Sequence, residues 1–286
     1  MKNKIMKYSI SSLIIILIII LIFFNKRENK KYNVAYNTNF DISEHDKKMI
    51  AKYGNNLKVA FILGEKVYIE EDIEIPEEKI KDIKSSVGKN VFIYHTHGTE
   101  SYKSKENYEM YQFYRSTDNN YNVINIGNCL EEKLKSKNFN VIHNKSFFDL
   151  PSVAGAYDRA RVELKEELKK NKEINLIIDV HRDAISEEEH KATTLNINGE
   201  KLAELRFVLG VDKTNDNYLY TLKLMIDLQK KANILYPGLF QPILIRKRDY
   251  NQDLISNSIL IEVGENCNQI EEAINSINCF AEILSL

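Results

Sequence analysis

Three short apolar runs that end in metal-binding side chains constrain the fold of this chain more than any other feature. They are VFIY (91–94) before His95 and His97, INLIIDV (174–180) before His181, and SILIEV (258–263), which contains Glu262. Buried strands that end in polar groups are typical of open α/β sheets, where sites form at the carboxyl ends of the strands. We therefore predict an α/β fold whose central sheet gathers these histidines and the glutamate at one edge.

The chain between these runs alternates between helix-like and strand-like patterns. Asn198-Gly199 is a strong hairpin signal between the segments 193–197 and 202–210. Strands separated by helices favour β-α-β units, so we expect a largely parallel, helix-covered sheet. The expected helices lie over 123–137, 154–170, 219–230 and 270–280, and the additional strands over 139–143 and 243–246.

The spacing of the histidines and glutamates favours a single zinc centre. Two residues separate His97 from Glu100, so one tight turn can aim both side chains at one ion. A catalytic zinc site has three protein ligands and an open position, and zinc binds both His nitrogen and carboxylate oxygen. We predict that His97, Glu100 and His181 hold Zn²⁺ and that Glu262 is the general base. His95 is the alternative to Glu100, because positions 95 and 97 share one face of a strand.

Four motifs in this order resemble the stage II sporulation protein P family. They are IYHTHGTESY (93–102), IDVHRDA (178–184), YPGLFQPILIRKRDYNQDL (236–254) and LIEVGENCNQIEEAINSI (260–277). The resemblance implies a membrane-anchored, zinc-dependent N-acetylmuramoyl-L-alanine amidase with additional endopeptidase activity, which strips septal peptidoglycan during engulfment. It also implies the stage II sporulation proteins D and M as partners, and an amidase-like or zinc-carboxypeptidase-like sheet.

The resemblance also marks individual positions of the chain. The family's key histidines correspond to His97 and His181, its late glutamate corresponds to Glu262, and Glu100 matches the first motif. The chain departs from the family pattern in two places. Gly98 stands where a Thr or a similar residue is expected, and Glu265 stands where Gly is common. Neither departure removes a candidate ligand, although Glu265 adds a charge near the site.

Further candidate residues lie close to these motifs. Arg182 could stabilise a developing oxyanion or pair with Asp183. Tyr102 could line a substrate groove or pack beneath a loop. Arg246 and Asn251, together with Gln252, could hold carboxylate or amide groups of the substrate, or form a basic solvated loop. We predict Arg182 as a catalytic residue and Arg246, Asn251 and Tyr102 as substrate-binding residues.

The N-terminal part of the chain contains an expected membrane anchor. Residues 8–24 are about seventeen uncharged and mostly apolar residues, near the short end of the range for a transmembrane helix. Lysines flank both sides, and no A-x-A-like cleavage site follows, which favours an uncleaved anchor. We expect residues 1–31 to form a cytoplasmic tip and a single-pass anchor in the cell membrane. The catalytic domain then lies outside the cytoplasm, because peptidoglycan does.

The remaining domain boundaries follow from changes in composition. We expect residues 32–89 to be a spacer or partner-contact region, with a hairpin over 58–71, and residues 90–286 to be the hydrolase domain. The net charge of −1 gives no electrostatic argument for nucleic-acid binding. The alternative functions are a membrane-tethered scaffold that binds murein without cutting it, and a zinc carboxypeptidase that trims stem peptides.

Overall fold

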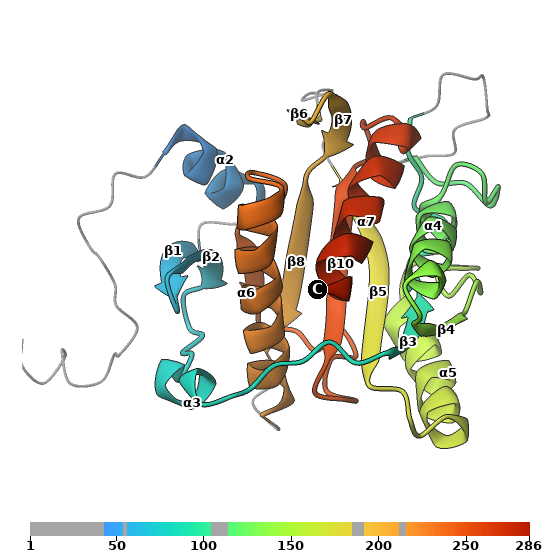
Figure 1. Ribbon diagram of the computed structural model, residues 1–286, viewed down its shortest axis with the longest axis horizontal. Helices are drawn as coiled ribbons and strands as arrows, with labels where there is room; N and C mark the ends of the chain where they lie inside the picture. The colour runs from blue at the N-terminus through green and yellow to red at the C-terminus, as the bar shows by residue number, and fades with distance from the viewer. Residues whose placement is uncertain (1–42, 54–55, 104–113, 185–191, 212–215) are drawn as a thin grey trace, which may run out of the picture.

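A computed structural model describes residues 43–53, 56–103, 114–184, 192–211 and 216–286 of the chain. Its centre is an eight-stranded sheet of order β1-β2-β9-β8-β10-β5-β3-β4, and β6 and β7 form a separate two-stranded sheet (Figure 1). The strands are β1 (Leu57–Ile62), β2 (Glu65–Glu70), β3 (Asn90–Tyr94), β4 (Asn140–His143), β5 (Leu176–Asp183), β6 (Thr194–Ile197), β7 (Glu200–Ala203), β8 (Leu205–Gly210), β9 (Ile243–Arg246) and β10 (Ser258–Glu265). The helices are α2 (Glu44–Tyr53), α3 (Glu77–Lys81), α4 (Val123–Ser136), α5 (Ala156–Lys170), α6 (Asn217–Leu235) and α7 (Ile270–Ser285).

The sheet is mixed but mostly parallel. Strands β4, β3, β5 and β10 run in one direction, whereas β8 pairs antiparallel with β10. A parallel neighbour requires a crossover, usually a helix. Glu262 of β10 is the register partner of both Arg206 and His181, so β8 starts at the sheet end where β5 finishes. The α/β class is confirmed, and the reversal at β8 is a feature that the sequence pattern did not indicate.

Three helices cover one face of the sheet. Helices α4, α6 and α7 pack on this face and enclose the largest core, to which the strands contribute residues such as Ile178, Phe207 and Ile261. Figure 1 shows α6 and α7 in front of the strands. The expected helices at 123–137, 154–170, 219–230 and 270–280 are all present, with ends shifted by a few residues.

The opposite face has two smaller cores with a pocket between them. Met49 of α2 packs with Val208 and Leu260, which are partners in the β8–β10 pairing. Leu164 of α5 packs with Ile177 of β5. Neither core covers the middle of this face, where β5 and β10 carry polar side chains. The uncovered strip therefore positions the candidate site.

The N-terminal strands belong to the central sheet rather than to a separate spacer. The hairpin expected over 58–71 forms as β1 and β2, and β2 pairs in parallel with β9 through Val67 and Ile243. Without β2 the backbone groups along one side of β9 would lack a partner. The folded unit therefore begins before residue 90. The sequence did not reveal this, because local alternation of apolar residues predicts a hairpin but not which strand pairs with it.

The apolar run at 8–24 lies outside the described residues, and so does the transmembrane helix expected there. Within the part of the chain that the structure describes, no helix is both long and apolar enough to cross a membrane.

Candidate metal centre

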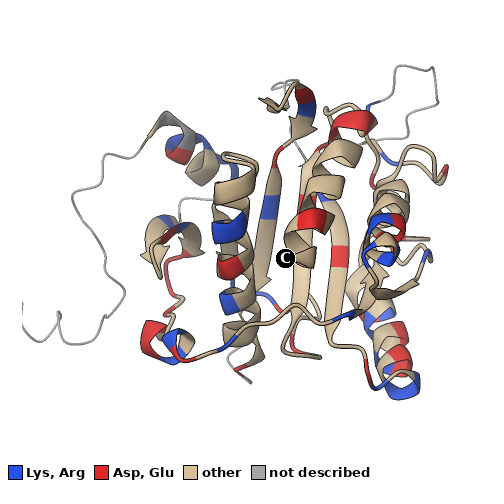
Figure 2. Cartoon of the chain, in the orientation of Figure 1, with Lys and Arg blue, Asp and Glu red and all other residues tan. Residues whose placement is uncertain are grey.

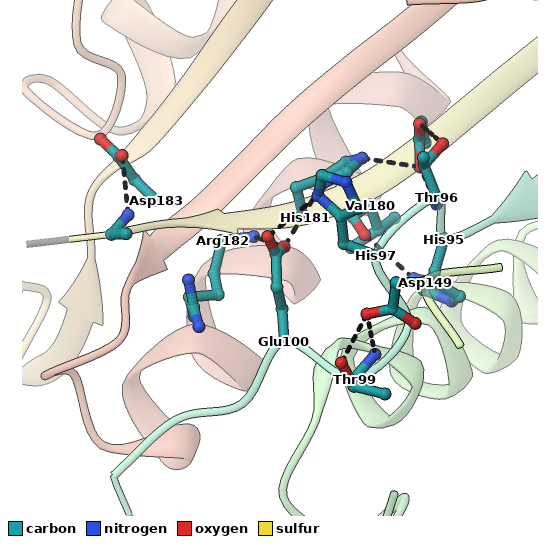
Figure 3. A network of polar contacts seen from close by, with 12 residues as sticks. His95, Thr96, His97, Thr99, Glu100, Asp149, Val180, His181, Arg182 and Asp183 are labelled. Atoms are coloured by element: carbon teal, nitrogen blue, oxygen red, sulfur yellow. Dashed lines mark hydrogen bonds and ion pairs between the residues drawn. The ribbon is translucent and has the colours of Figure 1, made fainter. Parts of the chain in front are cut away.

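His97, Glu100 and His181 meet where β3 and β5 end. Glu100 N–H donates to the carbonyl of His97 at 3.0 Å and closes the turn after β3. Nδ1 of His97 lies 3.2 Å from Oε1 of Glu100, and Nδ1 of His181 lies 3.3 Å from Oε2 of the same carboxylate. Figure 3 shows the Glu100 carboxylate pointing at both imidazoles. One ligand atom from each residue lies within 4.8 Å of the others.

These three side chains fit a zinc ion. Two imidazole nitrogens and one carboxylate oxygen are a known catalytic donor set. Bonds of about 2.0–2.1 Å in a tetrahedron place neighbouring ligand atoms about 3.3–3.4 Å apart, close to the separations around Glu100. Nε2 of His181 lies 3.0 Å from Oδ1 of Asp179, the carboxylate–histidine pairing that orients a metal ligand.

The charges around His181 favour a cation at this position. Burial lowers the pKa of His181, but the carboxylates of Asp179 and Glu100 outweigh it and raise that pKa well above its ordinary value. Burial has the opposite effect on Glu100 and raises its pKa, but the positive charge and hydrogen bond of His181 hold that pKa well below its usual range. A site that stabilises a proton between two carboxylates also stabilises a metal ion there.

Asp179 fixes the geometry between β3 and β5. Thr96 donates to it twice, from its backbone N–H to Oδ1 at 2.8 Å and from its hydroxyl to Oδ2 at 2.6 Å. Asp179 is 2 % exposed, so these bonds and His181 satisfy a buried carboxylate. Asp179 is not among the predicted site residues, although its position two residues before His181 on a strand places both on one face.

Glu262 lies beside His181 on the neighbouring strand. The two residues are register partners in the parallel β10–β5 pairing, so their side chains project from the same face. Burial and the negative charge of Asp183 together outweigh the opposing charge of His181 and raise the pKa of Glu262 to about 8. Oε2 of Glu262 is buried and has no hydrogen-bond partner among the described residues. This carboxylate is therefore available to exchange a proton.

A pocket of about 950 Å³ joins these groups on the uncovered strip. His97, Glu100, His181 and Glu262 line one part of it, and Arg246 lines another. Figure 2 shows charged residues within β5 and β8, in the middle of an otherwise largely uncharged sheet. The apolar part of the pocket wall is formed by Val208, Leu244 and Leu260.

Helix α2, which lies in the region predicted to be a spacer, supplies Tyr53 to the pocket and Lys52 to a carboxylate at its edge. Tyr53 donates its hydroxyl hydrogen to Asp183, and Lys52 Nζ lies 2.8 Å from the same carboxylate. Arg206 of β8 also binds Asp183 at 2.8 Å. Lys52 is 3.5 Å from Glu265, which offsets the extra charge noted in the last motif. The partners of the Asp183 carboxylate, Lys52, Tyr53 and Arg206, are thus remote from it in sequence.

His95 does not join the metal-binding group. Its Nδ1 donates to the carbonyl of Val180 at 3.0 Å, and its Nε2 lies 2.8 Å from Nε2 of His143. Gly127 makes room for this pair, since a Cβ there would lie 2.6 Å from both Nε2 atoms. Strand β3 ends at Tyr94, so the face-sharing argument for positions 95 and 97 fails where the chain turns. The geometry favours Glu100 over His95.

Arg182 lines the pocket, but its guanidinium forms hydrogen bonds with backbone carbonyls. Its Nε donates to the carbonyl of Ser101 at 3.1 Å, and an Nη donates to the carbonyl of Tyr114 at 2.9 Å. These bonds anchor the chain on both sides of the segment 104–113. The observed contacts make Arg182 a positioning residue, and its catalytic role stays a prediction.

Two of the expected substrate-binding residues are not among those that line the pocket, and their role in substrate binding stays a prediction. Tyr102 is fully buried and donates its hydroxyl hydrogen to the carbonyl of Val263 at 2.8 Å. Asn251 is 2 % exposed, accepts from Arg161 at 3.1 Å and donates to the carbonyl of Tyr157 at 3.0 Å. The polar atoms of both side chains form hydrogen bonds within the protein, and no local sequence pattern predicts these bonds.

The fold and the site together define an α/β protein with a candidate metal centre in an open pocket. The chain belongs to the stage II sporulation protein P family, whose profile matches residues 15–285. It is 32% identical over 214 residues to the stage II sporulation protein P of Bacillus subtilis (strain 168), which covers 69% of this chain and 50% of that protein. The chain therefore spans about half the length of the curated relative it matches.

Several solved amidase structures resemble the fold at low identity. The CwlD amidase of Clostridioides difficile, solved with the GerS lipoprotein, has a TM-score of 0.44 and 15% identity, over 69% of this chain and 95% of that one. The N-acetylmuramoyl-L-alanine amidase AmiC2 of Nostoc punctiforme has a TM-score of 0.40 and 14% identity, over 71% and 95%. An N-acetylmuramoyl-L-alanine amidase of Clostridium difficile 630 has a TM-score of 0.42 and 17% identity, over 70% and 94%.

Proposed function

We propose that this chain is a zinc-dependent peptidoglycan hydrolase that cleaves the N-acetylmuramoyl-L-alanine amide during engulfment in sporulation. The observation that carries the proposal is the convergence of His97, Glu100 and His181 beside the buried carboxylate of Glu262 in one pocket. Family membership supports the link to sporulation. Cleavage of stem-peptide cross-links is a further activity of the same site in this proposal.

Each side chain of the site has a distinct part in the proposed reaction. His97, Glu100 and His181 would hold the zinc ion, and Asp179 keeps the His181 ring oriented. A bound zinc ion supplies a Lewis acid for the scissile carbonyl and lowers the pKa of water to about 7. Glu262 accepts the proton of the attacking water and passes it to the leaving amine.

The ionisation of Glu262 suits this role when a cation is present. Without a bound metal ion, burial and Asp183 raise the pKa of Glu262 to about 8 against the charges of His181 and Arg206. A positive charge within a few ångströms favours the carboxylate form and lowers that pKa. Cation binding therefore prepares Glu262 to act as a base near the working pH.

The proposal extends to location and partners. Residues 8–24 would anchor the protein in the cell membrane by a single span and leave the hydrolase outside the cytoplasm, where murein is accessible. The stage II sporulation proteins D and M are the proposed partners, in keeping with the family. Peptidoglycan is the proposed substrate.

The test is digestion of purified murein by the full chain in detergent, with products identified by mass spectrometry. We expect zinc-dependent release of intact stem peptides from the glycan, and its loss on chelation. His97→Ala, His181→Ala and the isosteric Glu262→Gln should lower the rate by roughly 10²-fold or more. Glu282→Gln, a change at an exposed ion pair on α7, is the matched control and should keep full activity.

The products separate this proposal from its alternatives. Loss of single C-terminal residues from the stem would indicate a zinc carboxypeptidase. Binding to murein with no soluble product would indicate a scaffold. Normal turnover by Glu262→Gln would remove that residue from the proposed role.

A further inference from the structure

The pocket extends well beyond the metal centre, across the face of the sheet to β9. Arg246 is the register partner of Gly210, and Val208 is the partner of Leu260. Arg246 is therefore level with the start of β10, four residues before Glu262 and two strands away. With about 3.3 Å per residue and about 4.8 Å between strands, the two Cα atoms lie about 16 Å apart. Both side chains nevertheless line the same pocket.

Arg246 lines this pocket and is held there through its Nε. Its Nε donates to Oε1 of Glu70 at 3.1 Å, and the backbone N–H of Lys247 donates to Oε2 of Glu70 at 2.8 Å. Among the described residues, Glu70 is the one carboxylate that pairs with Arg246. The contact uses Nε alone and leaves the two terminal nitrogens of the guanidinium available. A planar guanidinium fixed in this way presents a fork that matches a carboxylate.

Two other arginines line the pocket, Arg115 and Arg182, and both are engaged near the metal centre. Arg115 lies 2.7 Å from Asp149 and 4.0 Å from Glu100, so two carboxylates offset its charge near the metal centre. Arg182 donates to the carbonyls of Ser101 and Tyr114. Among the described residues of the pocket wall, Arg246 is thus the arginine whose terminal nitrogens have no partner. Between Arg246 and Glu262 the wall is apolar, formed by Val208, Leu244 and Leu260.

We infer that Arg246, positioned by Glu70, binds a carboxylate of the stem peptide and so fixes the direction in which murein enters the pocket. This inference rests on the proposed function. In the proposed substrate the lactyl group is an amide and its sugars are neutral, so all carboxylates belong to the peptide. The peptide therefore runs from the metal centre over the apolar wall toward β9, and the glycan lies on the other side of the site.

The distance selects a carboxylate far along the stem. The Arg246 side chain spans part of the separation of about 16 Å, and an extended peptide covers about 3.5 Å per residue. The remaining gap corresponds to about three residues beyond the scissile amide. Arg246 accordingly recognises the distal part of the stem and is indifferent to a substrate that ends after two residues.

The test compares three soluble substrates: an N-acetylmuramoyl tetrapeptide with free distal carboxylates, the same tetrapeptide with those groups amidated, and an N-acetylmuramoyl dipeptide. Arg246→Gln should raise KM for the free tetrapeptide about 10–100-fold, the range for a hydrogen bond to a charged group, with little change in kcat. Neither other substrate should respond. Glu70→Gln should give a smaller rise in KM, and Arg246→Lys an intermediate one. Arg248→Gln is the matched control, an exposed arginine two residues further on.

A binding measurement separates this inference from the proposed reaction. Calorimetry with the zinc-loaded, full-length Glu262→Gln protein should show the same 10–100-fold preference for the free over the amidated tetrapeptide. If no substrate is cleaved by the wild type, the proposed function fails, and calorimetry still decides whether Arg246 binds the carboxylate. Equal losses for all three substrates on Arg246→Gln, or no preference in calorimetry, would overturn the inference.

Discussion

Asp46 fastens helix α2 to the sheet through several hydrogen bonds. Its Oδ2 accepts from the Ser43 N–H at 3.0 Å and from the Ser43 hydroxyl at 2.7 Å, while its own N–H donates to that hydroxyl oxygen at 3.1 Å. This reciprocal pattern is a capping box. Its Oδ1 accepts from the buried hydroxyl of Tyr68 at 2.9 Å and pairs with Lys66.

Asp46→Asn should destabilise the protein by about 1–3 kcal/mol, through loss of the charged cap and of the ion pair. Burial raises the pKa of Asp46, but hydrogen bonds from Lys66, Ser43 and Tyr68 outweigh it and lower the pKa to about 2. Because the folded-state pKa is depressed, the stabilisation is present above about pH 4 and disappears as the pH falls toward 2. Urea unfolding of wild type and variant at several pH values measures this.

The difference between the two proteins should therefore shrink in acid. Asp82→Asn is the control, because Asp82 is exposed at the end of α3 and its substitution should leave stability nearly unchanged. A difference that persists undiminished at pH 2 would contradict the role assigned to the Asp46 carboxylate.

At the scale of elements, α2, β1 and β2 complete both the sheet and the pocket. β2 pairs with β9, and α2 buries Met49 against the uncovered face. Tyr53 from α2 and Glu70 from β2 then reach Asp183 and Arg246 in the pocket. An N-terminal region expected to be a spacer is thus part of the folded unit.

A chain shortened to residues 43–286 should therefore fold, and one shortened to 90–286 should not fold stably. The second loses two strands and the helix that covers Val208 and Leu260, which exposes an apolar patch and the edge of β9. Thermal unfolding by circular dichroism and size-exclusion chromatography measure this. Cooperative unfolding of 90–286 at the temperature found for 43–286 would show that the N-terminal elements are dispensable.

At the scale of the whole molecule, a metal ion would join two parts of the chain that are far apart in sequence. The turn after β3 supplies His97 and Glu100, and β5 supplies His181 about eighty residues later. A ligand that binds only the folded state stabilises it by mass action.

Zinc at a hundred times its Kd should add about 2.7 kcal/mol, which corresponds to a rise in Tm of about 5–10 °C for a domain of this size. The rise should shrink as the pH falls, because a proton on His181, whose pKa is raised by Asp179 and Glu100, competes with the metal. Differential scanning fluorimetry with and without zinc measures this.

Two variants, one at the metal centre and one away from it, test whether zinc acts at the predicted site. His181→Ala should abolish the zinc-dependent rise, whereas His143→Ala should keep it, because His143 pairs with His95 and Glu131 away from the metal centre. An equal response of both variants to zinc would mean that the ion binds elsewhere.

The amino-acid sequence alone predicts those parts of the site and fold that depend on neighbouring residues. His97, Glu100 and His181 were predicted because each follows an apolar strand, and the structure brings these three together. The four main helices were predicted because apolar residues repeat at helical spacing. The membrane anchor at 8–24 stays a prediction. Local periodicity predicts these strands and helices, because each regular backbone conformation repeats its side-chain direction at a fixed residue spacing.

Only the tertiary structure decided which strands are neighbours and which polar groups share a partner. It turned His95 toward Val180, buried Tyr102 and Asn251, and brought Tyr53 to the pocket and Arg206 to Asp183. These outcomes depend on pairing across long stretches of chain, where burial and hydrogen bonding are satisfied for the whole sheet at once. A residue pattern states what a side chain can do, but its partners are set by the strands packed around it.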